Sequence, residues 1–151
     1  MLLFLFVFVF FGLVASIGTT YIQDEEVTPL AVGASVPVGL LAVALLVTNN
    51  LRDLPGDGLA GKRTLAVRIG DKPTRILYVL TILMAFLSLP YLSLLRPGAL
   101  LALLALPAAI APVRSVLRGT SGVGLVAVLG ATGKLQMIYG TLLCVGLALG
   151  I

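Results

Sequence analysis

The sequence has no histidine, no tryptophan and a single cysteine, and only 11% of its 151 residues are charged. Without histidine, the chain lacks both the usual general acid–base of neutral pH and the commonest metal ligand. The lone Cys144 has no second cysteine with which to form a disulfide or a thiolate metal cluster. Soluble domains carry roughly 25% charged residues, so this composition does not describe one. Any chemistry must use carboxylate, amide, ammonium and guanidinium groups.

Apolar residues fill most of the chain. They make up 60% of the sequence, and the mean hydropathy is +1.17. Several apolar runs approach the roughly 20 residues that a helix needs to cross a bilayer. The sequence therefore predicts an all-α, multi-span transmembrane helical bundle with about five spans. The expected spans cover about 2–22, 30–48, 74–95, the stretch from the turn at 96–98 to 113, and 135–151.

The basic residues indicate how such spans are oriented. Nine of the ten Lys and Arg residues lie within 49–75 and 114–134, two expected loops on the same side, and only Arg96 lies on the other side with the acids of 24–26. Cytoplasmic loops are enriched in Lys and Arg, so the loop at 49–73 is predicted to be cytoplasmic. We interpret the net charge of +4 as an orientation signal and an anionic-ligand site, with no nucleic acid as partner. The four tyrosines fall near span ends, which favours an interfacial aromatic belt.

The loop at 49–73 also carries a run of oxygen ligands. Asn49, Asp53 and Asp57 are spaced four residues apart, so they share one face if the helix continues. Two carboxylates and an amide oxygen are hard donors of the kind that Mg²⁺ takes, with water and substrate phosphate completing its shell. Pro55 and Gly56 favour a helix that ends near Asp53, with Asp57 on a following turn.

Cations follow the carboxylates closely, in the run Gly61-Lys62-Arg63-Thr64. Lysine offers a point charge and arginine a planar fork to phosphate oxygens, so acids and cations together suit a diphosphate held with Mg²⁺. The alternative is a solvated loop whose charges set the topology and pair with each other. The run is not a P-loop, because the upstream glycine pattern and the preceding strand are missing.

The string NNLRDLPGDGLAGKRTLAVRIG at 49–70 resembles the second aspartate-rich motif of the UbiA-type membrane prenyltransferases, and is closest to the menaquinone-pathway branch. Weaker similarity extends upstream through FFGLVASIGTTYIQ and PVGLLAVALLVTNN, and downstream through the final helices. The resemblance therefore covers most of the chain, with its specificity concentrated in 49–70.

The resemblance implies a fold of nine spans around a cavity that opens to the lipid. Residues 1–151 would then be the C-terminal part of a single membrane prenyltransferase domain. It also implies that Asp53 and Asp57 are catalytic and hold Mg²⁺ together with Asn49. Diphosphate binding would fall to a larger polar set: Asn49, Asn50, Arg52, Lys62 and Arg63.

The implied activity is transfer of a polyprenyl group from polyprenyl diphosphate to an aromatic acid in a multi-pass protein of the inner membrane. 1,4-Dihydroxy-2-naphthoate is the expected acceptor, and its carboxylate is lost in the reaction. Two alternatives remain open: another aromatic acceptor (hydroxybenzoate, homogentisate or a porphyrin), or a non-enzymatic, transporter-like membrane subunit. The family's first aspartate motif and early helices are not in this sequence. We therefore expect the chain alone to be inactive, with a missing N-terminal half as its partner.

Overall fold

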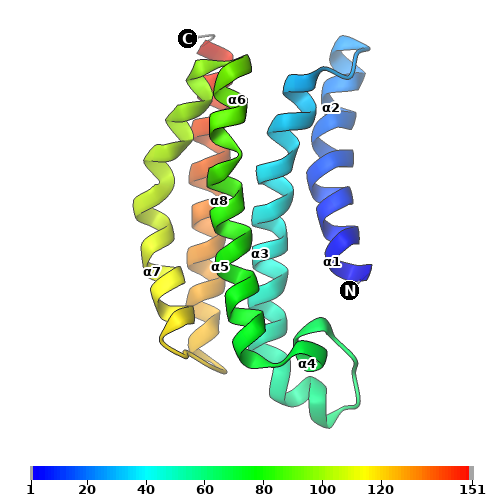
Figure 1. Cartoon of the computed structure of the whole chain (residues 1–151). Helices are drawn as coiled ribbons and strands as arrows, with labels where there is room; N and C mark the ends of the chain where they lie inside the picture. The colour runs from blue at the N-terminus through cyan, green and yellow to red at the C-terminus, as the bar shows by residue number, and fades with distance from the viewer. Residues whose placement is uncertain (1, 150–151) are drawn as a thin grey trace.

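The computed structural model describes residues 2–149, and every regular element in that range is a helix (Figure 1). Five helical passes are long and apolar enough to cross a membrane, which confirms the expected number of spans. In chain order the helices are α1 (Leu2–Val7), η1 (a π-helix, Phe8–Val14), α2 (Ala15–Asp24), α3 (Pro29–Leu59), α4 (Leu65–Ile69), α5 (Asp71–Leu87), α6 (Leu89–Leu95), η2 (a 3₁₀ helix, Pro97–Ala105), α7 (Leu106–Leu117) and α8 (Gly124–Leu149).

Helix α3 is the longest element and runs well past the expected end of the second span. Thr28 caps its start by accepting a hydrogen bond from the backbone N–H of Ala31 at 3.1 Å. The helix has 31 residues and continues through both Pro37 and Pro55. At 1.5 Å per residue it is about 46 Å long, whereas a hydrocarbon core is about 30 Å thick. One end of α3 therefore projects beyond the apolar layer, and that end carries the polar motif.

The second basic loop is much shorter than expected. Helix α7 continues to Leu117 and α8 begins at Gly124, so residues that the sequence assigned to a loop at 114–134 are mostly helical. Only 118–123 connect the two helices. Lys134 lies within α8 with its side chain exposed. The expectation of a loop over the whole of 114–134 was wrong, because the apolar residues between the glycines of GLVAVLGATG suffice to form a helix.

Small residues bring some helices into backbone contact. A Cβ built on Gly12 of η1 would lie 2.7 Å from the Cα of Gly39 in α3, so neither position has room for a side chain. Gly146 of α8 likewise meets the backbone of Gly98 in η2. Close helix approach through small residues is the usual packing mode in membranes, where lipid offers no hydrophobic drive for association.

Two tyrosines join α5 to α8 inside the bundle. Tyr78 and Tyr139 are fully buried. The Tyr78 hydroxyl lies 2.7 Å from Oγ1 of Thr132, and the Tyr139 hydroxyl donates to the carbonyl oxygen of Ala85 at 2.7 Å. The expected aromatic belt is therefore wrong for these two, because they face a neighbouring helix. Tyr21 and Tyr91 are exposed near span ends, as a belt requires.

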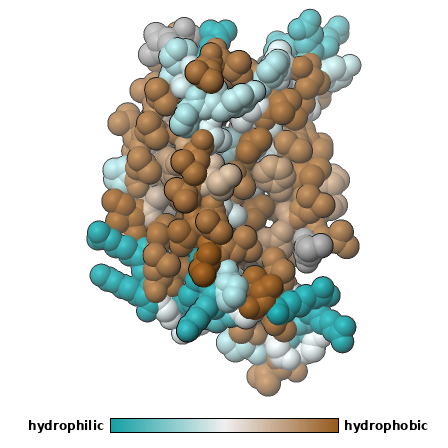
Figure 2. Space-filling model, in the orientation of Figure 1, coloured by the Kyte–Doolittle hydropathy of each residue, from teal (hydrophilic) through white to brown (hydrophobic). Residues whose placement is uncertain are grey.

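The surface is polar at its two ends and apolar between them. Figure 2 shows hydrophilic residues gathered at the end that carries α4 and at the opposite end, with a broad apolar band in the middle. Among the described residues the six acids lie at 24–26, 53, 57 and 71, at or near the ends of the passes. No acid in residues 2–149 lies at the centre of a span, where a transporter would place an ion pathway.

Candidate active site

Asn49, Asp53 and Asp57 lie on one uninterrupted helix, the projecting end of α3. The expected break after Asp53 is wrong. Pro55 removes one helical hydrogen bond, but it lies in an exposed turn where water can hydrate the freed carbonyl group. The three side chains therefore keep the four-residue spacing that places them along one face of the helix. They differ in burial, since the Asp53 side chain is 47% exposed and that of Asp57 only 10%.

A glycine turn at the end of α3 brings Lys62 back to Asp57. Gly61 has a φ of 70°, in the left-handed region that favours glycine. The N–H of Lys62 donates to the carbonyl oxygen of Asp57 at 2.9 Å, and the N–H of Gly61 donates to that of Gly58 at 3.3 Å. This pair of bonds is a Schellman cap. The Lys62 ammonium then lies 3.0 Å from Oδ1 of Asp57.

Arg52 and Asp53 form a second acid–base pair one turn earlier. Nε of Arg52 lies 2.8 Å from Oδ1 of Asp53, and its terminal nitrogen Nη2 lies 2.9 Å from Oδ2. Both side chains are partly exposed. A fork-to-fork contact of this kind fixes the carboxylate's orientation, although its exposure to solvent limits its contribution to stability.

The two pairs face one shallow hollow of about 380 Å³. It is lined by Arg52, Asp53, Pro55, Gly56, Asp57 and Lys62. Two carboxylates beside two cations is the donor set that a Mg²⁺–diphosphate needs, because Mg²⁺ keeps water and substrate phosphates as its other ligands. Within residues 2–149 no three His, Cys, Asp or Glu side chains converge on a metal position. The site therefore suits a metal that arrives with phosphate, not one caged by protein.

The remaining predicted residues do not join this hollow. Asn50 and Arg63 line a separate hollow of about 240 Å³ with Leu3, Phe4, Thr64 and Leu65. Asn49 lines neither of the two. The structure thus brings four of the seven predicted site residues together in one hollow and places two others in a second hollow.

Arg75 is a buried arginine that the sequence analysis interpreted only as an orienting charge. It is 8% exposed and holds both carboxylate oxygens of Asp71, at 2.6 and 2.8 Å. Its remaining nitrogen donates to the carbonyl oxygens of Val116 and Thr120, at 2.7 and 2.9 Å. Arg75 therefore ties the start of α5 to the end of α7. Asp71 and Arg75 are four residues apart at the start of a helix, and this spacing could have predicted their ion pair from the sequence.

The family follows from comparison with known proteins. Residues 3–123 match the UbiA prenyltransferase family. The chain belongs to the UbiA prenyltransferase family. The matched range includes the whole end of α3, the Schellman turn and α4. The resemblance carried by 49–70 is therefore confirmed, and the all-helical, multi-span architecture agrees with it.

Individual relatives carry a more specific name. The chain is 40% identical over 144 residues to a 1,4-dihydroxy-2-naphthoate octaprenyltransferase of Mycobacterium tuberculosis, covering 95% of this chain and 49% of the relative. It is 32% identical over 146 residues to an Escherichia coli protein of the same name, covering 95% and 47%. The chain thus spans about half the length of the curated relatives it matches. No solved structure matches it.

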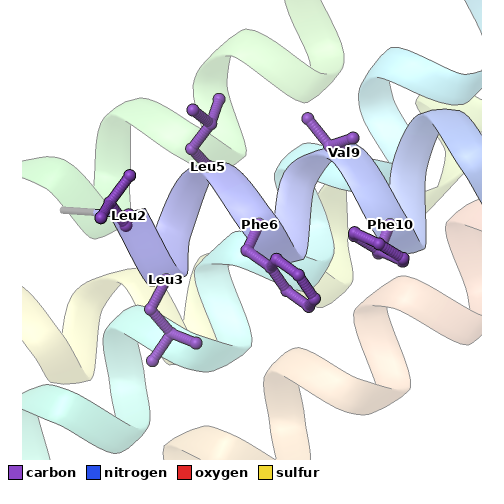
Figure 3. A pocket seen from close by; sticks show the side chains of 6 residues that line it. All are labelled: Leu2, Leu3, Leu5, Phe6, Val9 and Phe10. Carbon is purple, nitrogen blue, oxygen red and sulfur yellow. The ribbon is translucent and has the colours of Figure 1, made fainter.

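A third hollow lies on the outer face of the first pass and shares no lining residue with the hollow at Asp53 and Asp57. It measures about 650 Å³ and is lined by Leu2, Leu3, Leu5, Phe6, Val9 and Phe10. Figure 3 shows all six side chains on the continuous helical ribbon of α1 and η1. The ring centroids of Phe6 and Phe10 are 4.1 Å apart, in a stacked arrangement. It has no polar side chain that could orient a substrate, so it is an apolar packing surface.

Proposed function

We propose that the complete protein transfers a polyprenyl group from polyprenyl diphosphate to an aromatic acid, with 1,4-dihydroxy-2-naphthoate as the acceptor. The observation that supports this most is the hollow at the end of α3, where Asp53 and Asp57 stand beside Arg52 and Lys62 in a UbiA-family chain. The names of the relatives support the choice of acceptor. Hydroxybenzoate, homogentisate or a porphyrin would suit the same diphosphate site and are competing acceptors.

In this proposal Asp53 and Asp57 hold Mg²⁺, with Asn49 as a further oxygen donor one turn earlier on α3. Mg²⁺ would supply positive charge to the diphosphate oxygens as the leaving group departs. Arg52 and Lys62 would move from their carboxylate partners to the diphosphate, adding donors where negative charge develops. The ring carbon that bears the carboxylate forms a bond to the first carbon of the prenyl chain, and the bond from this prenyl carbon to the diphosphate oxygen breaks. The carboxylate then leaves the ring as CO₂.

We also propose that a further segment completes the site. The chain spans about half of its relatives, and the described residues contain a single pair of acids in the hollow. The first pass buries only 6% of its most apolar stretch, compared with 44% for α3, so α1 and α2 leave a large face for other helices to cover. The complete protein, meaning this chain with that segment, would be a multi-pass protein of the inner membrane. Its α4 end would face the cytoplasm.

The test is prenyl transfer by the complete protein in liposomes. With Mg²⁺, polyprenyl diphosphate and an equimolar mixture of 1,4-dihydroxy-2-naphthoate, hydroxybenzoate and homogentisate, we expect the prenylated naphthalene product to dominate. The same chain without the further segment should give no product. A preference for hydroxybenzoate or homogentisate would correct the acceptor. Failure to prenylate any of the three would refute the enzymatic proposal.

A further inference from the structure

The hollow beside Asn50 shares no lining residue with the hollow that we assign to the diphosphate, although the family resemblance implied diphosphate binding by both Asn50 and Arg63. Asn50 is 9% exposed, yet its side chain has no hydrogen-bond partner among the described residues, and it faces the hollow. No side-chain nitrogen or oxygen in residues 2–149 is both fully buried and unpaired, so the Asn50 amide keeps its access to solvent through the hollow. A ligand that accepts from and donates to this amide would take the place of that solvent.

The other walls of the hollow divide into one charged side and one apolar side. Arg63 supplies a guanidinium that is exposed and makes no ion pair in residues 2–149, and Thr64 follows it at the cap of α4. Leu3 and Phe4, from the start of α1, and Leu65 supply the apolar side. Figure 1 shows this end of α1 near the loop that carries α4. One cation, one amide and an aromatic wall suit a planar ring that bears a single anionic group.

The contents of the hollow argue against a second diphosphate site. No Asp or Glu lines it, so a metal-bound diphosphate would find no carboxylate for its ion. At about 240 Å³ it is smaller than typical ligand pockets of about 300–1,000 Å³, so it can take a compact ring but not a polyprenyl chain.

Its position relative to the diphosphate hollow also fits an acceptor. The two hollows share no lining residue, but they meet at consecutive residues, Lys62 in one and Arg63 in the other. Asn50 and Asp57 are seven residues apart on the same side of α3, which is about 10 Å along the helix axis. A ring held by Arg63 would thus lie beside a diphosphate held by Lys62.

We propose that Asn50 and Arg63 bind the carboxylate end of the aromatic acceptor, with Phe4 and Leu65 against its ring. This inference rests on the proposed function, because that function supplies the aromatic acid. Arg63 acts as a specificity-determining residue for acids over neutral aromatics. Since the reaction removes the carboxylate, the product would lack the group that Arg63 holds, which favours its release.

The test compares an acid with its neutral counterpart in the complete protein. Arg63→Gln should raise the Michaelis constant for 1,4-dihydroxy-2-naphthoate by about 10–100-fold, the range for one charge-assisted hydrogen-bond contact. The Michaelis constant for polyprenyl diphosphate should change less than about 2-fold. Arg68→Gln, which removes an exposed arginine at the far end of α4, is the matched control and should change neither constant.

Direct binding separates this inference from the enzymatic proposal. Without Mg²⁺ or diphosphate, the purified complete protein should bind 1,4-dihydroxy-2-naphthoate, and Arg63→Gln should weaken this by about 10–100-fold. Binding of naphthalene-1,4-diol should be insensitive to the substitution. Equal losses for the acid and the diol, or a loss confined to diphosphate, would overturn the inference even if transfer occurs. If transfer fails but the acid binds in this pattern, the inference stands and the enzymatic proposal falls. If Arg63→Gln does not fold, Arg63→Lys should bind the acid more weakly than wild type and leave diol binding unchanged.

Discussion

Lys62 turns back over the end of α3 and meets Asp57 twice, once through its backbone N–H at 2.9 Å and once through its ammonium group at 3.0 Å. The backbone bond belongs to the cap that Gly61 makes possible, so the position of the lysine does not depend on the ion pair alone. Asp57 is largely buried while Lys62 is largely exposed. The lysine can therefore leave the carboxylate for a ligand without disturbing the helix end.

The first prediction concerns that lysine. Lys62→Gln in the complete protein should raise the Michaelis constant for polyprenyl diphosphate about 10–100-fold, because one charge-assisted contact to phosphate is lost. Steady-state kinetics at saturating acceptor measure it. Lys72→Gln, which removes an exposed lysine from the start of α5, should have no such effect. Equal effects of the two substitutions would mean that Lys62 contributes only general positive charge.

The second prediction concerns the hydroxyl groups between α5 and α8. Tyr78→Phe and Tyr139→Phe should each lower the free energy of unfolding by about 1 kcal/mol, the usual value of a hydrogen bond between membrane helices. The Tyr139 ring should keep its edge contact with Phe86, whose ring centre is 5.2 Å away. Unfolding in mixed detergent micelles measures the change. Tyr91→Phe, at an exposed position, should be neutral; an equal loss there would show that the hydroxyl bonds are not responsible.

The third prediction concerns Arg75. Arg75→Gln removes the donors that serve Asp71, the carbonyl oxygen of Val116 at the end of α7 and that of Thr120 in the α7–α8 connection. We expect a loss of about 2–3 kcal/mol in unfolding free energy, since the buried carbonyl group of Val116 loses a charged partner. Arg68→Gln is the control and should stay within about 0.5 kcal/mol of wild type. A stability unchanged by Arg75→Gln would show that water replaces the guanidinium.

The fourth prediction concerns orientation. In a Cys144→Ser background, a cysteine placed by Glu26→Cys should react with an impermeant maleimide on intact cells. One placed by Gly58→Cys should react only after the membrane is opened. Gly58 has open space around its Cα, so the substitution is tolerated locally. We expect this orientation because nine of the ten Lys and Arg residues lie toward the end that carries Gly58, and cytoplasmic loops are enriched in these residues. Labelling of Gly58→Cys alone on intact cells would reverse the topology.

The sequence predicted the number of spans, the all-α class and the family, because length and apolarity determine the first two and the string at 49–70 carries the third. It missed the continuity of α3. Pro55 is a strong helix breaker in isolation, and only its exposed position near the helix end makes the missing hydrogen bond tolerable. It also assigned 124–134 to a loop, since glycine is unfavourable in soluble helices but common in membrane ones.

Six of the seven predicted site residues line one or the other of two hollows at the end of α3, but the sequence could not divide them between the two. Lys62 and Arg63 are neighbours in the chain, yet they line different hollows, and this depends on the turn at Gly61. The sequence treated Arg75 only as an orienting charge and did not predict that Asn50 and Arg75 are buried. An amide or a guanidinium in a loop-like sequence gives no sign of whether it will be covered.

The rate of prenyl transfer by Asp53 and Asp57 variants tests the central claim most directly. In the complete protein, Asp53→Asn or Asp57→Asn should lower the rate by about 10²–10³-fold, the effect of removing one preorganised electrostatic contact. Both variants should melt at the wild-type temperature to within a few degrees. Asp24→Asn makes the same chemical change at the opposite end and should leave the rate unaltered. A near-normal rate for Asp53→Asn with a folded protein would contradict the assignment of the end of α3 as the diphosphate site.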